Sequence, residues 1–476
     1  MRSAILPGLL ALGCASAPGY RYSSVDMPPS FREVTDTARA VPYLVTRPAE
    51  TTAAEPAPTG VSPDYWEQLG DTTLSRLIRE VRTANLDVQG ARARVNAARS
   101  EHTRAALDLT PSATVSGSYA RQRLSSASFP GFGTFPDQDV WGASVDPSWE
   151  LDVFGRIRHN VQAHGALVGV AEEDLRNIQV TLTAEVARAY FVLRGAQEQL
   201  EIARRNAENQ RHTFDVTRQR LEAGRGSAFD TERAQAQLSS TLASIPAREA
   251  AVAEAQYRIG VLVGRAPTVV AEELAQPGEF PPLPDVTSVG DPASVVRTRP
   301  DVATAERVAA AQRAFVGAAK ANYLPRISIG GSLGYAAPQF HSIGDQTTFR
   351  YVIGPVITWP GLNLGRVKAE VDAAQANEAA ARAQYNQAVL SALEEVETAL
   401  TRYRSARVRV ERLLEASAAS DHAAELARLR FQEGVIDLLQ VLDAERTQLA
   451  AQDQLAQGRV EAATAYAALY RAVGGR

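Results

Sequence analysis

The sequence predicts a mainly α-helical protein with a smaller β part, built from two hairpins of very long helices and four β-strands. Three observations indicate this fold class. Hydrophobic residues make up 45% of the 476 residues, largely through alanine, but aromatic residues only 7%, as in proteins built from long helices. Two long stretches contain no proline, and much of the chain recurs at a nearly fixed offset.

Charge and residue usage exclude several functional classes. The net charge of −4 leaves no excess of basic residues for binding nucleic acid. The six histidines are scattered, and the single cysteine excludes a thiolate zinc site and an intrachain disulfide. The sequence contains no nucleophile elbow and no phosphate-binding glycine loop. We therefore expect no enzymatic activity, no cofactor and no bound metal.

Four carboxylates are the strongest enzymatic alternative. Asp87 and Asp301 occupy equivalent places in a repeated segment, and Glu394 and Glu395 are adjacent. Such a pair could act as general acid and base. On alanine-rich helices these carboxylates are more often solvated or ion-paired, which favours a structural role.

The amino terminus has the order of a bacterial lipoprotein signal. Cys14 directly follows an apolar stretch, residues 4–12, which Arg2 precedes. After cleavage at such a signal, the new terminal cysteine receives a lipid. We therefore expect a signal peptide at residues 1–13 and lipid attachment at Cys14; the alternative is a free cysteine. Residues 14–62 are rich in proline, which disfavours a helix and predicts an extended tether.

An internal duplication sets the organisation of the chain. Residues 86–111 recur as residues 300–325 at an offset of 214, and from Gly155 onward the offset is 210. A constant offset over this length indicates two copies of one structural unit of about 200 residues. We expect a first copy at residues 63–264, a proline-rich linker at 265–299 and a second copy at 300–476.

Each copy is expected to contain a hairpin of long helices. Within the proline-free stretches, apolar residues recur three or four positions apart, which places them on one stripe of a helix. The longer helix of each pair would extend about 100 Å at ~1.5 Å per residue, more than a soluble core requires. Gly224 and Gly434 follow these helices and predict tight turns. The predicted helices cover residues about 156–222 and 228–262, and about 363–431 and 437–472.

Four short segments alternate between apolar and polar residues, at about 113–124, 140–152, 326–336 and 347–359. A period of two predicts β-strands with one apolar face, here arranged as two hairpins. The apolar face carries aromatic residues near the strand ends, as in the girdles of membrane β-barrels. These residues are Trp141, Trp149, Tyr335, Tyr351 and Trp359.

The strands are long enough to cross a bilayer at a tilt. An open four-stranded sheet cannot lie in lipid, because the amides at its edges would have no partners. Strands from other copies must therefore close the sheet, and three copies would form a twelve-stranded barrel. The alternative is a small sheet whose apolar face packs on the helices.

A set of short motifs extends from about residue 62 to 474. The motifs are Trp66-Glu67-Gln68-Leu69-Gly70-Asp71, Ala84-Asn85-Leu86-Asp87-Val88, Trp149-Glu150-Leu151-Asp152-Val153-Phe154-Gly155-Arg156, Arg299-Pro300-Asp301-Val302, Ala305-Glu306-Arg307, Tyr323-Leu324-Pro325, Gly354-Pro355 and Trp359-Pro360. Together they resemble the outer membrane factor family of Gram-negative bacteria, the TolC- and OprM-type efflux ducts, and within it the lipoprotein branch often labelled NodT. One departure, Gly361-Leu362-Asn363-Leu364, lies at a joint between strand and helix.

The resemblance implies a homotrimer that forms a β-barrel in the outer membrane, continuous with a long α-helical barrel in the periplasm. It implies a duct without cofactor or covalent chemistry, which exports small molecules such as drugs together with a periplasmic adaptor and an inner-membrane pump. The lipid anchor and tether favour a pump of the resistance-nodulation-division type. The expected location is the outer membrane, with a lipid anchor and a large periplasmic portion.

The resemblance also implies two functional regions at the helix turns. In the family the turns meet the adaptor, which implies contacts at Gly224, Arg225, Gly434 and Val435. The alternative for the two glycines is a purely structural role in ending the helices, which needs a positive φ.

The second region is a periplasmic gate. Leu439 and Asp443 lie one helical turn apart, at places that match the apolar and acidic rings that narrow OprM-like ducts. A ring of Leu439 would exclude water, and a ring of Asp443 would favour cations. Asp230 in the other hairpin is expected to brace the closed state, although its helix-capping role competes. The alternative is that Leu439 packs the tip and Asp443 pairs with Arg446.

Two further functions remain alternatives. A duct for type I secretion of peptides or proteins would share the same fold. A non-transporting coiled-coil scaffold in the periplasm would explain the helices but not the strands with their aromatic ends. Extraction from membranes distinguishes a scaffold from a duct, because carbonate releases a scaffold, whereas a membrane barrel requires detergent.

Overall fold

The structure is a computed structural model that describes residues 27–31, 65–125, 136–286 and 289–475. The lipid attachment predicted at Cys14 lies outside the described residues, as does most of the expected tether. The described helices are α2 (Thr72–Ala84), α3 (Leu86–Leu107), α4 (Arg156–Glu222), α5 (Ala228–Leu262), α6 (Pro267–Glu273), α7 (Pro292–Thr298), α8 (Pro300–Ala321), α9 (Leu364–Gln432) and α10 (Leu438–Ala472). The strands are β1 (Ser112–Gln122), β2 (Gln138–Leu151), β3 (Arg326–Ala337) and β4 (Phe349–Thr358).

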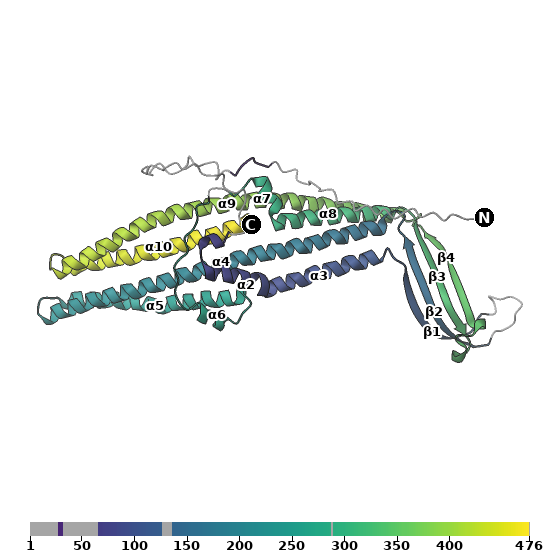
Figure 1. The fold of residues 1–476 in the computed structure, drawn as a ribbon, viewed down its shortest axis with the longest axis horizontal. Helices are drawn as coiled ribbons and strands as arrows, with labels where there is room; N and C mark the ends of the chain where they lie inside the picture. The colour runs from purple at the N-terminus through teal and green to yellow at the C-terminus, as the bar shows by residue number, and fades with distance from the viewer. Residues whose placement is uncertain (1–26, 32–64, 126–135, 287–288, 476) are drawn as a thin grey trace.

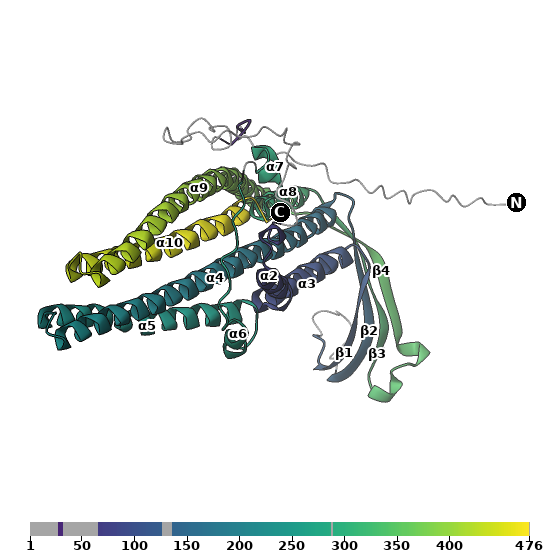
Figure 2. The ribbon, with the colours of Figure 1, turned by 60° about the vertical axis from the view of Figure 1, so that its left-hand side comes forward.

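The molecule is elongated, with a helical part and a sheet at opposite ends. The hairpins α4–α5 and α9–α10 run side by side and turn at the same end, in both views (Figures 1 and 2). Helices α3 and α8 lie along the other half of the helical part and lead into the sheet (Figure 1). This architecture of long helical hairpins and four strands confirms the predicted fold class.

The four strands form one antiparallel sheet in the order β1-β2-β3-β4. Val145 of β2 pairs with Val115 of β1 and with Leu333 of β3, so the apolar positions of neighbouring strands lie on the same face. The sheet has two edges, because β1 and β4 each pair with one strand only among the described residues. No helix among the described residues is long and apolar enough to cross a membrane.

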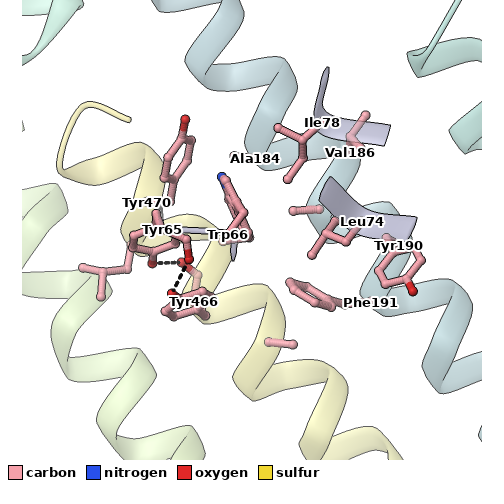
Figure 3. Packing of buried hydrophobic residues seen from close by; sticks show 14 of the residues in the cluster. Tyr65, Trp66, Leu74, Ile78, Ala184, Val186, Tyr190, Phe191, Tyr466 and Tyr470 are labelled. Carbon is pink, nitrogen blue, oxygen red and sulfur yellow. Dashed lines mark hydrogen bonds between the residues drawn. The ribbon is translucent and has the colours of Figure 1, made fainter. Parts of the chain in front are cut away.

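The largest core cluster lies midway along the helical part, where α2 packs on α4 and the preceding residues Tyr65 and Trp66 pack on α10. Tyr65 stacks on Tyr466, with ring centroids 4.4 Å apart, and each hydroxyl donates to the other residue's carbonyl oxygen, at 2.8 and 3.1 Å. Figure 3 shows this pair beside Trp66 and Tyr470. Phe31, within the segment expected to be a tether, belongs to the same cluster and is almost fully buried. Burying side chains of this size contributes about 1.5–3 kcal/mol each, so the cluster holds the two hairpins together.

Candidate membrane sheet, helix tips and constriction

The two tryptophans at the helical end of the sheet occupy equivalent places in the two copies. Trp149 Nε1 donates to the carbonyl oxygen of Leu109 at 2.9 Å, and Trp359 Nε1 donates to that of Tyr323 at 3.1 Å. Both carbonyl oxygens lie in the short segments that join a helix to the following strand, α3 to β1 and α8 to β3. The indole bonds therefore fix these rings at the base of the sheet.

The other three predicted girdle residues lie toward the loop end of the sheet. Trp141 packs against Tyr119, with ring centroids 4.5 Å apart. Tyr335 and Tyr351 both pack against Phe349, at 5.7 and 6.2 Å between ring centroids. The five predicted residues thus form two groups at opposite ends of the sheet. Tyr119 and Phe349 also belong to the loop-end group. Sequence analysis did not select them, because their position among the aromatic residues depends on contacts with neighbouring strands.

The opposite face of the sheet is polar. Asp146 accepts hydrogen bonds from Ser116 of β1 and Ser144 of β2, each at 3.1 Å. The sheet therefore has one face suited to lipid and one suited to water.

Two acidic residues connect the sheet to the long helix α4. Asp152 accepts hydrogen bonds from the backbone amides of Ile157 and Arg158, at 3.0 and 2.9 Å, and so caps the start of α4. Partial burial raises the pKa of Asp152, but these hydrogen bonds and the charge of Arg158 outweigh it and lower the pKa overall. Glu150 accepts two hydrogen bonds from Arg156, at 2.9 and 2.8 Å.

The helix turns have the same geometry in both hairpins. Gly224 has φ 69° and Gly434 has φ 77°, and a Cβ atom at either position would meet no atom within 4 Å. The amides of Arg225 and Val435 donate to carbonyl oxygens five residues earlier, at 2.8 and 2.9 Å, which closes each helix. Val435 is 68% exposed. The turns are therefore open surfaces at the end of the molecule farthest from the sheet (Figure 1).

A contact that sequence analysis missed ties the two tips together. Arg220 of α4 lies over the ring of Phe431 of α9, 4.2 Å from its centroid. Its Nη2 atom donates to the carbonyl oxygens of Phe431 and Gln432. Nothing in the local sequence around Arg220 points to this partner, because the two residues come from different copies of the repeat.

The helices that follow the turns begin with capping residues. Asp437 Oδ1 accepts a hydrogen bond from the amide of Gln440 at 3.1 Å, which is one half of a capping box. In the first hairpin Ser227 Oγ accepts from the amide of Phe229 rather than from that of Asp230. Asp230 therefore lies in the first turn of α5 without serving as the cap.

The predicted gate residues lie on the exposed side of α10. Leu439 is 52% exposed, whereas its neighbours Leu438 and Leu442 are buried in the tip cluster. Asp443 is exposed. Arg446, which was the alternative partner for Asp443, donates to Gln237 at 2.8 Å instead.

The third predicted gate residue, Asp230, is half-buried. No hydrogen bond or ion pair within the part of the chain that the structure describes joins Asp230 to Asp443. The structure thus places Leu439 and Asp443 on one exposed face of one helix and leaves Asp230 on the other hairpin.

Two of the four carboxylates considered for acid–base chemistry, Asp301 and Glu395, share one ion-pair partner. Asp301 and Glu395 both accept hydrogen bonds from Arg299, at 2.6 and 2.7 Å. Across the described ranges, no group of three or more histidine, cysteine or acidic residues could hold a metal ion.

Most of the chain matches one family of known proteins. Residues 77–265 and 293–475 match the family described as "Outer membrane efflux protein". The chain belongs to that family, which confirms the resemblance in its motifs.

Individual relatives cover nearly the whole chain. "Nodulation protein T" of Rhizobium leguminosarum bv. trifolii is 27% identical over 98% of this chain and 95% of its own length. "Probable efflux pump outer membrane protein TtgC" of Pseudomonas putida is 26% identical over 97% of this chain and 93% of its own length. "Probable outer membrane lipoprotein SilC" of Salmonella typhimurium is 27% identical over 81% of this chain and 82% of its own length.

Solved structures show the same fold. The outer-membrane channel OprN is 37% identical, with a TM-score of 0.81 over 90% of this chain and 98% of that chain. The outer membrane protein VceC of Vibrio cholerae, at 23% identity, matches in fold with a TM-score of 0.77 over 87% of this chain and 99% of that chain. The protein is therefore an outer membrane efflux channel, and the predicted location in the outer membrane is confirmed.

Proposed function

We propose that three copies of this chain form the exit duct of a tripartite efflux system. In this system the duct takes small molecules such as drugs from an inner-membrane pump of the resistance-nodulation-division type, through a periplasmic adaptor, to the outside of the cell. The observation that carries the proposal is a four-stranded sheet joined to helices of 67 and 69 residues. The sheet has an apolar aromatic face and two edges that pair with no other strand among the described residues. Helices of that length would extend about 100 Å into the periplasm.

The free edges of the sheet support a closed assembly. Each unpaired backbone group in lipid costs several kcal/mol, and β1 and β4 have 11 and 10 residues. Pairing β4 of one copy with β1 of the next removes both edges. Three copies of the sheet give twelve strands, and the two copies of the repeat in each chain, at residues 63–264 and 300–476, each contribute one hairpin of strands.

The exposed turns support docking of the adaptor. Gly224, Arg225, Gly434 and Val435 lie at the tips of the hairpins with open space around them. The helices that precede and follow each turn are closed by their own hydrogen bonds, so the turn residues remain available to a partner. Just inside the tips, Leu439 and Asp443 would form the narrow part of the duct, and Asp230 would brace it from the neighbouring hairpin.

Lipid attachment at Cys14 would add a second membrane anchor beside the barrel. We expect the variant Cys14→Ala to weaken anchoring without preventing barrel insertion. Failure of the wild-type protein to incorporate labelled palmitate would contradict lipid attachment.

Deletion of the gene tests the proposed export. We expect greater susceptibility to drugs and greater retention of a fluorescent efflux dye, both restored by the wild-type gene. Loss of a secreted protein with unchanged drug susceptibility would favour the secretion duct instead. Release of the protein from membranes by carbonate would favour the scaffold.

A further inference from the structure

A buried polar seam joins the two hairpins between the tips and the central core. Helix α4 runs toward the tips and α10 runs back, so their residues meet in antiparallel register. Asn206 Nδ2 donates to Gln452 Oε1 at 2.9 Å, and Thr213 Oγ1 donates to Glu445 Oε1 at 3.0 Å. These contacts place Gln210, midway between Asn206 and Thr213, at the level of Gln448.

Glu445 is the acidic residue at the end of this seam nearer the tips. It is only 1% exposed. Its Oε1 atom accepts the bond from Thr213 and lies 3.7 Å from Arg428 Nη1, which is beyond hydrogen-bond distance. Its Oε2 atom has no hydrogen-bond partner among the described residues. A carboxylate in this position is poorly compensated, because burying an ion costs several kcal/mol unless its oxygens are fully bonded.

Gln210 is a second buried polar side chain of the seam whose hydrogen-bonding atoms have no partner among the described residues. It is a fully buried side chain, and within the described part of the chain neither its amide oxygen nor its amide nitrogen has a partner. It lies one turn from Thr213 on the same face of α4, facing α10. A neutral carboxylic acid at Glu445 has a hydroxyl to donate, and the Gln210 oxygen is an acceptor without a donor.

The charged groups that face Glu445 are few. From α9, Arg428 lies at 3.7 Å with a side chain 22% exposed, and Asp421 is reached through Gln448, whose Nε2 donates to it at 2.9 Å. The buried side chains of α4 and α5 at this level are uncharged. On α10 itself, Asp443 and Arg446 point to the exposed side. Arg428 is therefore the charged group closest to Glu445, and Asp421 is connected to the seam through the amide of Gln448.

We propose that Glu445 is a proton-binding site, and that the proton it takes up holds the two hairpins together in the periplasmic half of the molecule. Burial raises the pKa of Glu445, and the hydrogen bond from Thr213 and the charge of Arg428 reduce that effect without cancelling it. The neutral form therefore persists to a higher pH than for an exposed glutamate. As pH rises through the raised pKa, a charge forms in the seam, water must enter to solvate it, and the hairpins separate more easily.

This inference rests on the proposed function only in its last step, from separation of the hairpins to opening of the duct. The titratable residues of the apolar cluster around Tyr466 are tyrosines, whose pKa burial raises still further above neutral pH, and the cluster around Val441 consists of apolar side chains. Separation would therefore begin at Glu445 and reach the tips through α10.

Infrared titration of the purified protein tests the proton site without any channel assay. We expect the wild type to show a carbonyl band of a protonated carboxylic acid that persists to a higher pH than the bands of exposed glutamates and is lost as pH rises further. This band should be absent from Glu445→Gln. The matched variant Glu425→Gln, at an exposed position of α9, should keep the band. A wild-type spectrum without a band that Glu445→Gln removes would overturn the proposal.

Single-channel recording tests the last step. We expect the conductance of the wild type and of Glu425→Gln to rise with pH, and that of Glu445→Gln to lose this dependence. If the infrared band behaves as expected but the pH dependence of conductance is the same in all three proteins, Glu445 binds a proton that does not govern opening. Absence of any conductance in all three would contradict the proposed duct rather than the proton site.

Discussion

A Cβ atom added to Gly195 would lie 2.0 Å from Cγ2 of Val460. The two residues belong to different hairpins, α4 and α10, and lie between the central core cluster and the polar seam. At this point the helices approach so closely that only glycine fits on α4. Glycine within a helix lowers stability by about 1 kcal/mol relative to alanine. The close packing of α4 against α10 offsets this loss.

The first prediction is that Gly195→Val destabilises the assembled protein. The added side chain must displace Val460, and overpacking of this kind costs about 1–3 kcal/mol. The matched control is Gly365→Ala near the start of α9, where an added Cβ meets no atom within 4 Å. Thermal unfolding should show a lower midpoint for Gly195→Val and an unchanged or higher midpoint for Gly365→Ala. Equal midpoints for the two variants would contradict the close contact.

The second prediction concerns Arg299, whose side chain is 5% exposed. It donates to the carbonyl oxygen of Ala472 at 2.6 Å and to both Asp301 and Glu395. Arg299→Met should lower stability by about 1–3 kcal/mol, because the buried carbonyl oxygen of Ala472 loses its donor, whereas Asp301 and Glu395 are partly exposed and can bond water instead. Arg299→Lys should restore only part of the loss, since lysine lacks the planar group that spans the acceptors.

The same site predicts a pH dependence. Burial raises the pKa of Asp301, but the hydrogen bonds and charge of Arg299 outweigh it and lower the pKa overall. The ionised form is therefore favoured by folding, and its stabilisation is present above the ordinary value of about 3.9 and lost as pH falls through the lowered pKa. The difference in thermal midpoint between wild type and Arg299→Met should shrink in that acidic range. A difference that grows on acidification would show that Asp301 is not the partner.

Sequence patterns predict the framework well because it depends on local rules. Proline-free stretches with a helical apolar stripe predict α4 and α9, and alternation predicts the strands. Those rules cannot show what a residue meets on a distant segment. Glu445 looks like a solvated acid on a polar helix, and only the register of α10 against α4, more than two hundred residues away, reveals that it is buried.

Some residues of the candidate site can be recognised in the sequence and others cannot. The turn glycines are visible in sequence because positive φ favours glycine, and the structure places both at the tips. Arg220 and its contact with Phe431 are not visible, because cation–aromatic contacts between hairpins leave no periodic trace. Leu438 and Leu439 are indistinguishable by type, and only the packing of α10 separates the buried residue from the exposed one.

The third prediction tests adaptor docking at the turns. Gly224→Leu and Gly434→Leu have open space for the side chain, so each should cost only about 1–2 kcal/mol for the positive φ. We expect efflux to fail while the amount of trimer stays normal. Gly344→Leu is the control, because Gly344 also has a positive φ and open space but lies in the loop between β3 and β4. A parallel loss of trimer and efflux in the turn variants would make the turns purely structural.

The fourth prediction separates two adjacent leucines. Leu439→Ala should raise single-channel conductance with little loss of stability, because Leu439 is exposed in the single chain. Leu438→Ala should instead cost about 2–5 kcal/mol, because that side chain is buried in the tip cluster. Asp443→Ala should reduce the preference for cations. Unchanged conductance in Leu439→Ala together with unchanged selectivity in Asp443→Ala would place the constriction elsewhere.

Electron cryomicroscopy of the detergent-extracted protein tests most directly the central claim that three chains close one continuous duct. The account predicts a particle with threefold symmetry, in which β4 of each copy pairs with β1 of the next to give twelve strands above a single helical tube. A monomer, a particle of different symmetry, or a sheet whose β1 and β4 edges stay unpaired would contradict it.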